Sequence, residues 1–168
     1  APFNRPDADV ILRSSDNVDF RVHKLILSIA SPFFEQMFRL PTPPPPEKED
    51  ESWHAGLPLV PMTESGATIE LVLRFMYPIP SPKVTLEDIG ALLEFSRKYD
   101  VHICDSQVDF GLRNSVASDP VGVYALSLAY NLPDIGKLAA VAACQLPTTK
   151  LDSPLLDYLS ARQYRQLM

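Results

Sequence analysis

Residues 8–38 decide the fold of this chain, and they read ADVILRSSDNVDFRVHKLILSIASPFFEQMF. The stretch opens with the apolar run Val10–Leu12 and returns as Phe20–Val22 after the polar turn Ser14–Asn17. Serine, aspartate and asparagine side chains hydrogen-bond their own backbone in turns, and alternating apolar and polar residues are typical of a half-buried strand. The first half of the stretch therefore predicts two short strands lying side by side.

The second half of the stretch changes to a helical spacing of apolar residues. Leu25 and Ile29 are four positions apart, and so are Phe34 and Phe38, which places each pair on one face of a helix. Ser31-Pro32 separates the two pairs, because serine caps a helix and proline fits its first turn. We predict two short helices, with Phe34 and Phe38 anchoring the core.

The order and spacing of these residues resemble the BTB/POZ domain. The matching residues are Asp9, Val10, Leu12, Phe20, Val22, His23, Lys24, Leu27, Ser31, Pro32, Phe34, Met37 and Phe38. The resemblance implies a protein-interaction domain, commonly a dimer, that has no catalytic activity of its own.

Helical patterns continue along the rest of the chain. Residues 69–76 and 86–99 carry apolar residues at helical spacing, and the second segment begins with a Thr85–Asp88 capping box. From residue 119 onward the pattern predicts helical hairpins, with a second capping box at Ser160 and Gln163. The whole chain resembles single-domain fungal BTB proteins with a helical C-terminal extension.

These features predict an α+β fold that is mostly helical. We expect a small three-stranded edge sheet, in which Leu57–Pro61 is held at an edge by its prolines. The expected domains are a BTB/POZ core over residues 8–117 and a helical C-terminal extension over residues 118–168. Within the core, a flexible proline-rich and acidic insertion is expected at residues 41–53. The less favoured interpretation is that this segment is a polyproline ligand for an aromatic groove of a partner.

Residues 1–7 are expected to form a loose lead-in to the fold. Some BTB subfamilies carry a long N-terminal helix and strand that exchange between dimer partners. Seven residues leave no room for such an arm, so the resemblance implies an unswapped dimer here.

Composition and motifs argue against several classes of function. The net charge of −6 does not suit a general nucleic-acid binder, and the sequence has no apolar run long enough to span a membrane. The pair His102 and Cys104 matches no standard zinc spacing, and no nucleophile or phosphate-binding motif is present. We therefore expect no enzyme activity, no cofactor, no metal, no nucleic acid and no membrane partner.

The cysteine usage predicts an intracellular protein, cytoplasmic or nuclear. Cys104 and Cys144 are too few for a disulfide framework in a chain of 168 residues. We expect both to be free thiols in a reducing compartment.

A candidate interface with a partner lies at the start of the first helix. The resemblance implies a charged pocket near the dimer seam, formed by an acid at the first strand and a base at the start of the first helix. The residues expected at the interface are Asp9, Lys24, Leu25, Ile26, Leu27 and Ala30. His23 is expected to make a buried structural hydrogen bond rather than to act as a switch.

The expected function is dimerisation and recruitment of other proteins, with the chain itself as the first partner. The first alternative is a substrate adaptor for a cullin-type ubiquitin ligase. Family members that bind cullins carry a short apolar-x-Glu element. This sequence has no clean copy of that element, which makes the cullin alternative less favoured. The second alternative is a structural monomer in which the proline loop or the helical tail covers the dimer face.

Overall fold

The computed structural model describes residues 2–41, 52–80, 82–147 and 151–167. By its internal contacts the chain divides into two compact units. Unit 1 comprises Ala1–Pro82 with Glu94–Cys104, and unit 2 comprises Lys83–Leu93 with Asp105–Met168. The domain boundary expected between residues 117 and 118 stays a prediction.

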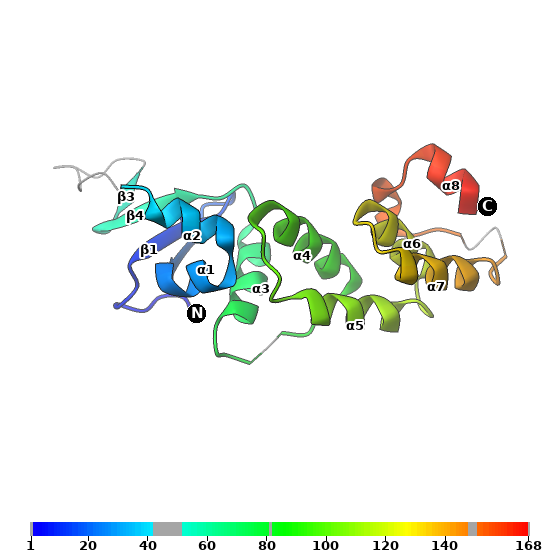
Figure 1. Ribbon diagram of the computed structural model, residues 1–168, viewed down its shortest axis with the longest axis horizontal. Coiled ribbons are helices and arrows are strands. Elements are labelled where there is room, and N and C mark those ends of the chain that lie inside the picture. Colours follow the sequence, from blue (N-terminus) through cyan, green and yellow to red (C-terminus); the bar gives the residue numbers. More distant parts are fainter. Residues whose placement is uncertain (1, 42–51, 81, 148–150, 168) are drawn as a thin grey trace. The chain divides into compact units, whose positions relative to one another are not determined.

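Unit 1 is built on a small mixed sheet with helices, and the α+β class is confirmed (Figure 1). Its elements are β1 (Val10–Arg13), β2 (Asp19–Val22), α1 (Lys24–Ala30), α2 (Pro32–Arg39), β3 (Trp53–His54), β4 (Leu57–Pro61), α3 (Gly66–Met76) and the end of α4 (Leu86–Tyr99). The core is formed by apolar side chains from the strands, α1, α2, α3 and α4, with Ile11, Leu12, Leu27, Phe34, Ile69 and Leu73 among the largest that are fully buried.

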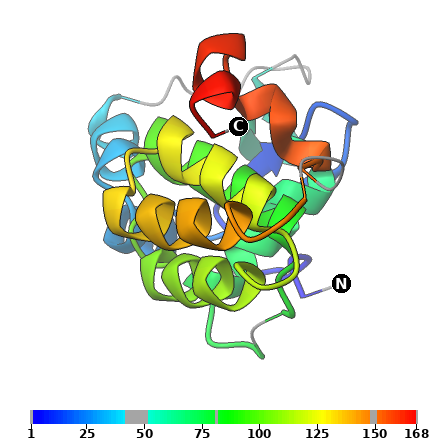
Figure 2. The ribbon, with the colours of Figure 1, turned by 90° about the vertical axis from the view of Figure 1, so that its right-hand side faces the viewer.

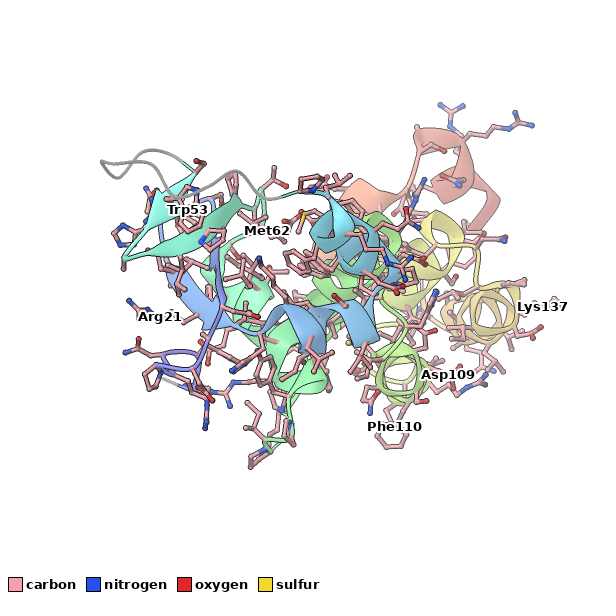
Figure 3. The ribbon with its side chains drawn as sticks, turned by 60° about the vertical axis from the view of Figure 1, so that its left-hand side comes forward. Arg21, Trp53, Met62, Asp109, Phe110 and Lys137 are labelled. Atoms are coloured by element: carbon pink, nitrogen blue, oxygen red, sulfur yellow. The ribbon has the colours of Figure 1, made fainter. Side chains whose placement is uncertain are left out.

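The sheet has four strands in the described part of the chain, one more than expected. Their order is β2-β1-β4-β3, with β1 and β4 parallel and the other pairs antiparallel. The additional strand is Trp53–His54, at the border of the predicted insertion; Trp53 lies on this outer strand in Figure 3. Residues 42–51 of the predicted insertion lie outside the described residues.

The expectation that Leu57–Pro61 forms an edge strand is wrong, because β4 lies between β1 and β3. Its prolines fall where the two pairings do not overlap. Leu59–Pro61 pairs with β1, whereas only Leu57 and Pro58 pair with β3. Pro58 pairs with β3 but not with β1, and Pro61 pairs with β1 but not with β3. Each proline therefore has one side without a paired strand, where its missing N–H is not needed.

The N-terminal lead-in is packed against the sheet, which corrects the expectation that it is loose. Phe3 is 4% exposed, and its ring meets the rings of Phe20 and Tyr77 edge-on. Asn4 forms a parallel β-bridge with Arg21, whose backbone N–H donates to the carbonyl oxygen of Phe3 (3.0 Å). The buried ring of Phe3 therefore anchors this short segment to the sheet.

Unit 2 is built from helices joined by short connections, with no strand among its described residues. Besides the start of α4 it contains α5 (Asp105–Ser115), α6 (Pro120–Ala129), α7 (Pro133–Ala143), the 3-10 helix η2 (Pro154–Tyr158) and α8 (Ala161–Leu167). Figure 2 shows α6 and α7 side by side as a helical hairpin, as the sequence predicted. The tight approach is possible because Gly136 of α7 faces Ser127 of α6.

The helix starts that the sequence predicted are confirmed by hydrogen bonds of the capping residues. Ser31 accepts from the backbone N–H of Phe34, and Asp119 accepts from that of Gly122. The two capping boxes also form, at Thr85–Asp88 and Ser160–Gln163.

Candidate interaction surface

Helix α1 begins with a cap supplied from outside the helix. His23, the residue at the cap position, makes no side-chain capping bond. Instead Asp9, directly before β1, accepts a hydrogen bond at Oδ1 from the backbone N–H of Lys24 (2.7 Å). A carboxylate at the start of a helix satisfies an otherwise unpaired donor and suits the helix dipole. Asp9 therefore fixes the direction in which α1 leaves the sheet.

The apolar residues of α1 divide between the core and the surface. Leu27 is 0% exposed and packs into the core of unit 1, whereas Leu25 is 70% exposed and Ile29 is 78% exposed. Leu25 and Ile29 are four residues apart and share the outer face of the helix. Two large aliphatic side chains on seven helical residues form an exposed apolar ridge, a feature that marks interaction sites on protein surfaces.

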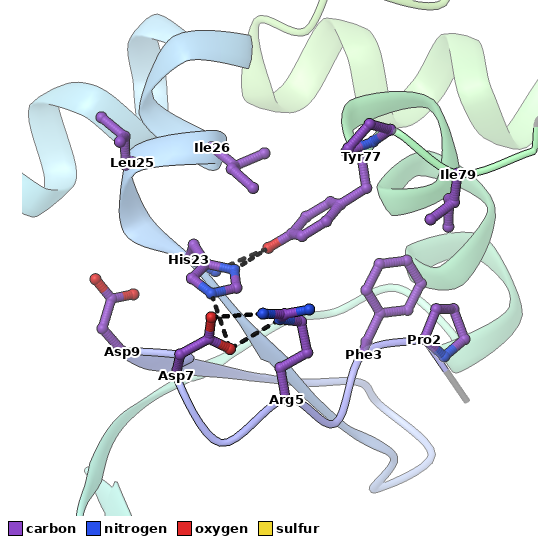
Figure 4. A pocket seen from close by; sticks show the side chains of 11 residues that line it. Pro2, Phe3, Arg5, Asp7, Asp9, His23, Leu25, Ile26, Tyr77 and Ile79 are labelled. Atoms are coloured by element: carbon purple, nitrogen blue, oxygen red, sulfur yellow. Dashed lines mark hydrogen bonds and ion pairs between the residues drawn. The ribbon is translucent and has the colours of Figure 1, made fainter.

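One hollow, with a volume of about 680 Å³, lies on one side of this ridge. Figure 4 shows side chains from the lead-in, α1 and the end of α3 around it. Its lining is mostly apolar and comprises Pro2, Phe3, Arg5, Asp7, Asp9, His23, Leu25, Ile26, Tyr77, Pro78 and Ile79. We call it hollow A.

A second hollow, of about 530 Å³, is also lined by α1. Its lining residues are Ile26, Ile29, Ala30, Pro32, Met76, Pro78, His102 and Ile103. We call it hollow B. Ile26 and Pro78 belong to both hollows, so the two lie next to each other with the residues of α1 at their shared border.

The polar end of hollow A is a connected set of charged groups. Arg5 donates to both carboxylate oxygens of Asp7 (2.8 Å each), and Nε2 of His23 lies 3.6 Å from Oδ1 of Asp7. The hydrogen bonds from Arg5 lower the pKa of Asp7 to about 2, although partial desolvation acts against this. Asp7 is therefore a fixed negative charge in neutral solution.

His23 and Tyr77 form the other connection in hollow A. The backbone N–H of His23 donates to the Tyr77 hydroxyl oxygen (2.8 Å), and Nδ1 of His23 lies 3.1 Å from the same oxygen. Burial raises the pKa of Tyr77, so the phenol keeps its proton. The expected structural hydrogen bond at His23 is present, but the side chain is 22% exposed and therefore only partly buried.

The structure brings most of the expected interface residues together but gives them different roles. Asp9, Leu25 and Ile26 line hollow A, and Ala30 lines hollow B. Leu27 is fully buried, so it serves the core of unit 1 and is not part of this surface. The Lys24 ammonium lies over the ring of Phe38, 5.6 Å from its centroid, while Asp9 accepts a hydrogen bond from the backbone N–H of Lys24.

Sequence reasoning missed several residues of the surface. Ile29, at 78%, is its most exposed large apolar side chain, and the lead-in and the segment after α3 supply much of hollow A. The signal for the lead-in was Phe3, the one aromatic residue among residues 1–7. The segment at Pro78 and Ile79 carried no local signal, because it joins α1 only through the tertiary fold.

The sequence matches the family model of the BTB/POZ domain over residues 3–114. This match covers most of the chain, so the protein belongs to the BTB/POZ domain family. BTB/POZ domains are protein–protein interaction modules and are not a family of enzymes. No curated protein matches the chain.

Two further properties of the described residues bear on the kinds of site present. No group of three or more His, Cys, Asp or Glu side chains among them is placed to hold a metal ion. None of the described helices combines the length and apolar character needed to cross a membrane. The exposed ridge of α1 with its two hollows is the candidate interaction site.

Proposed function

We propose that this chain is a non-catalytic interaction module that pairs with a second copy of itself through the outer face of α1. The observation that carries the proposal is the exposure of Leu25 and Ile29 between two apolar hollows. Removing such side chains from water is favourable through the hydrophobic effect. Membership of the BTB/POZ family supports protein association as the role of the domain.

A second copy suits this surface because the surface carries both raised and hollow parts. In a two-fold dimer the same patch meets itself, so each protruding side chain of one copy must enter a recess of the other. Leu25 and Ile29 supply the protruding side chains, and hollows A and B supply the recesses. In the proposed dimer, Leu25 and Ile29 of each copy enter hollows of the partner.

The size of the surface sets the expected strength of the association. A helix of seven residues is about 10 Å long, whereas a typical stable interface buries roughly 800 Å² on each partner. Exposed neighbours such as Phe33 and Ile103 must therefore add to the contact. We expect a reversible dimer that dissociates in the micromolar range.

The test compares charged substitutions on and off the ridge. Leu25→Glu and Ile29→Glu place a carboxylate in the proposed seam at positions that are already solvent-exposed, so the monomer should still fold. Phe110→Glu is the matched control, because Phe110 is 69% exposed and points away from α5 in Figure 3. Sedimentation of each variant over a concentration series measures its mass, and circular dichroism checks its folding.

The proposal expects a dimer from the parent and from Phe110→Glu, and a folded monomer from the two ridge variants. A parent chain that stays monomeric at high concentration would overturn it and would support the structural-monomer alternative. Recruitment of other proteins, including a cullin, is a further proposal for the same module. Failure of a purified cullin N-terminal domain to bind either the parent or the ridge variants would rule out the cullin role.

A further inference from the structure

Helices α6 and α7 hold a leucine of the C-terminal tail against their surface. Leu151 is 6% exposed and forms one core cluster with Val121 of α6 and Ala143 of α7. The half-buried side chains of Tyr124 and Ala140 pack against this cluster. One end of the α6–α7 pair is therefore covered by a segment of the chain itself, and the side chain that enters it is a leucine.

The other end of the α6–α7 pair is hollow. The hollow has a volume of about 330 Å³ and is lined by Tyr124, Ser127, Leu128, Asn131, Leu132, Pro133, Gly136, Lys137 and Ala140. We call it hollow C. Tyr124 and Ala140 belong both to this lining and to the contacts of the Leu151 cluster, so hollow C continues the place where the tail is bound.

The buried part of the lining of hollow C has no unpaired polar group. Ser127 is 2% exposed, and its hydroxyl donates to the carbonyl oxygen of Tyr124 (2.7 Å). A Cβ atom on Gly136 would lie only 2.8 Å from the oxygen of that hydroxyl, so the two helices approach closely here. The rest of the lining is largely apolar, with Leu128, Leu132 and Pro133 among its residues. An aliphatic side chain is thus the kind of group that hollow C suits.

A single cation lies at the rim of hollow C. Among the described residues that line the hollow, Lys137 is the one that carries a charge. Its ammonium is 3.7 Å from a carboxylate oxygen of Asp134, and the two side chains are 78% and 85% exposed. An ion pair between side chains as exposed as these is worth little, so the ammonium can pair with a further carboxylate. Hollow C therefore combines an apolar recess with a positive charge.

We propose that hollow C is a docking site for a short segment of a partner protein in which a leucine or isoleucine stands next to a carboxylate. The aliphatic side chain enters hollow C, as Leu151 enters the neighbouring end, and the carboxylate pairs with Lys137. One side chain and one exposed ion pair hold the segment, so we expect a dissociation constant of about 0.1–1 mM. The site lies wholly in unit 2 and does not rest on self-association through α1.

The tail supplies a probe for this site, because Leu151 is followed by Asp152. The probe is the hexapeptide LDSPLL, the sequence of residues 151–156, acetylated and amidated so that the aspartate carries its only charge. Titration into the full chain should give saturable NMR shifts of the amides of Gly136 and Lys137. A peptide with asparagine in place of aspartate should bind about two- to fivefold more weakly. A peptide with serine in place of its leucines should bind at least about tenfold more weakly.

Variants of the chain identify the groups that bind the peptide. Lys137→Gln should weaken binding about two- to fivefold and should no longer distinguish the aspartate peptide from the asparagine peptide, whereas Lys137→Arg should bind as the parent does. Leu128→Glu places a carboxylate in the hollow at a position already 36% exposed, so the variant should fold and lose most of its binding. Arg165→Gln is the matched control, because Arg165 is an exposed cation of α8 outside the lining and its removal should change nothing.

The same titration on Ile29→Glu separates this site from self-association. Ile29 belongs to unit 1, so this variant should bind the peptide as the parent does, whether or not the parent dimerises. Absence of saturable shifts well above the expected concentration range would overturn the proposal. So would equal binding of the leucine-free peptide, or equal binding of the aspartate and asparagine peptides to the parent. Shifts at Val121 and Ala143 without shifts at Gly136 would show that the peptide displaces the tail instead, and would also overturn it.

Discussion

Ser31 joins the start of α2 to the end of α4 through a hydrogen bond to Tyr99. Its hydroxyl donates to the carbonyl oxygen of Tyr99 (2.5 Å) and accepts from the backbone N–H of Phe34 (3.2 Å). The side chain is fully buried, so one hydroxyl satisfies a helix donor and a helix acceptor that water cannot reach. A residue that the sequence identified as a local cap also makes a contact between distant segments.

Replacing Ser31 by alanine should therefore cost more than losing an ordinary cap. We expect Ser31→Ala to lower the free energy of unfolding by about 2–4 kcal/mol, since it removes a cap and leaves a buried carbonyl oxygen unpaired. Ser65→Ala is the control, because Ser65 caps α3 on the surface (3.3 Å to the N–H of Thr68) and should cost about 1 kcal/mol. Urea unfolding measures both, and equal losses would contradict the double role of Ser31.

The aromatic residues of α2 should differ in their contribution to stability. Phe34 is fully buried and stacks on Tyr99 at 5.5 Å between centroids, whereas Phe38 is only half-buried. We expect Phe34→Ala to lower the free energy of unfolding by about 3–5 kcal/mol and Phe38→Ala to lower it clearly less. Chemical denaturation of the two variants tests this order. A larger loss of unfolding free energy for Phe38→Ala than for Phe34→Ala would contradict the prediction that Phe34 is the main anchor of α2.

Glu64 should make the stability of unit 1 sensitive to acid. Burial raises the pKa of this carboxyl, but hydrogen bonds from Lys98 and Tyr99 outweigh it, and the net pKa lies below its usual value of 4.5. A carboxyl whose pKa is lowered on folding stabilises the folded state above the pKa of the unfolded chain. This contribution is therefore present above pH 4.5 and is lost as the pH falls through the lowered value.

The Glu64→Gln variant tests this origin of acid sensitivity. Its midpoint of urea unfolding should change less than that of the parent when the pH is lowered below 4.5, the usual pKa of glutamate. Glu70→Gln is a suitable control, since Glu70 pairs with Arg74 within α3 and is more exposed. Identical acid sensitivity in the parent and in Glu64→Gln would show that Glu64 does not contribute.

Gly122 should tolerate no side chain at the start of α6. A Cβ atom there would lie 2.3 Å from Oδ2 of Asp119 and 2.6 Å from Oγ of Ser153, which are hydrogen-bonded to each other. Gly122→Ala should therefore break this connection between α6 and η2 and cost about 1–3 kcal/mol. In the control Gly111→Ala the close atom is the terminal methyl group of Ile89, which can rotate away. In thermal unfolding, the midpoint temperature of Gly122→Ala should be well below that of Gly111→Ala.

The two cysteines should react with thiol reagents at very different rates. Cys104 and Cys144 both lie within the described residues and neither is part of a disulfide bond, but Cys104 is buried, whereas Cys144 is exposed at the end of α7. Under native conditions we expect one thiol to react rapidly with a chromogenic disulfide reagent, and both to react after denaturation without a reductant. A Cys144→Ser variant should lose the fast phase. Rapid reaction of two thiols in the folded parent would contradict the burial of Cys104.

Local features of the sequence determined much of the fold. The caps at Ser31, Asp119 and Ser153 each bind an N–H within three residues, so short segments of sequence contain both partners of the bond. The helical spacing after residue 65 and the two strands of residues 8–22 are likewise patterns of near neighbours. The family resemblance rests on such local patterns, and the match over residues 3–114 confirms it.

The tertiary structure alone decided which apolar residues of α1 reach the surface and where β4 lies in the sheet. Leu25, Ile26, Leu27 and Ile29 are all apolar, so the pattern could not show that Leu27 faces the core while Leu25 and Ile29 face solvent. The place of β4 depends on its pairing with β1, about 48 positions away in the chain (Ile11 with Leu59). Hydrophobicity and spacing describe a residue and its near neighbours, whereas burial and strand order depend on segments that only folding brings together.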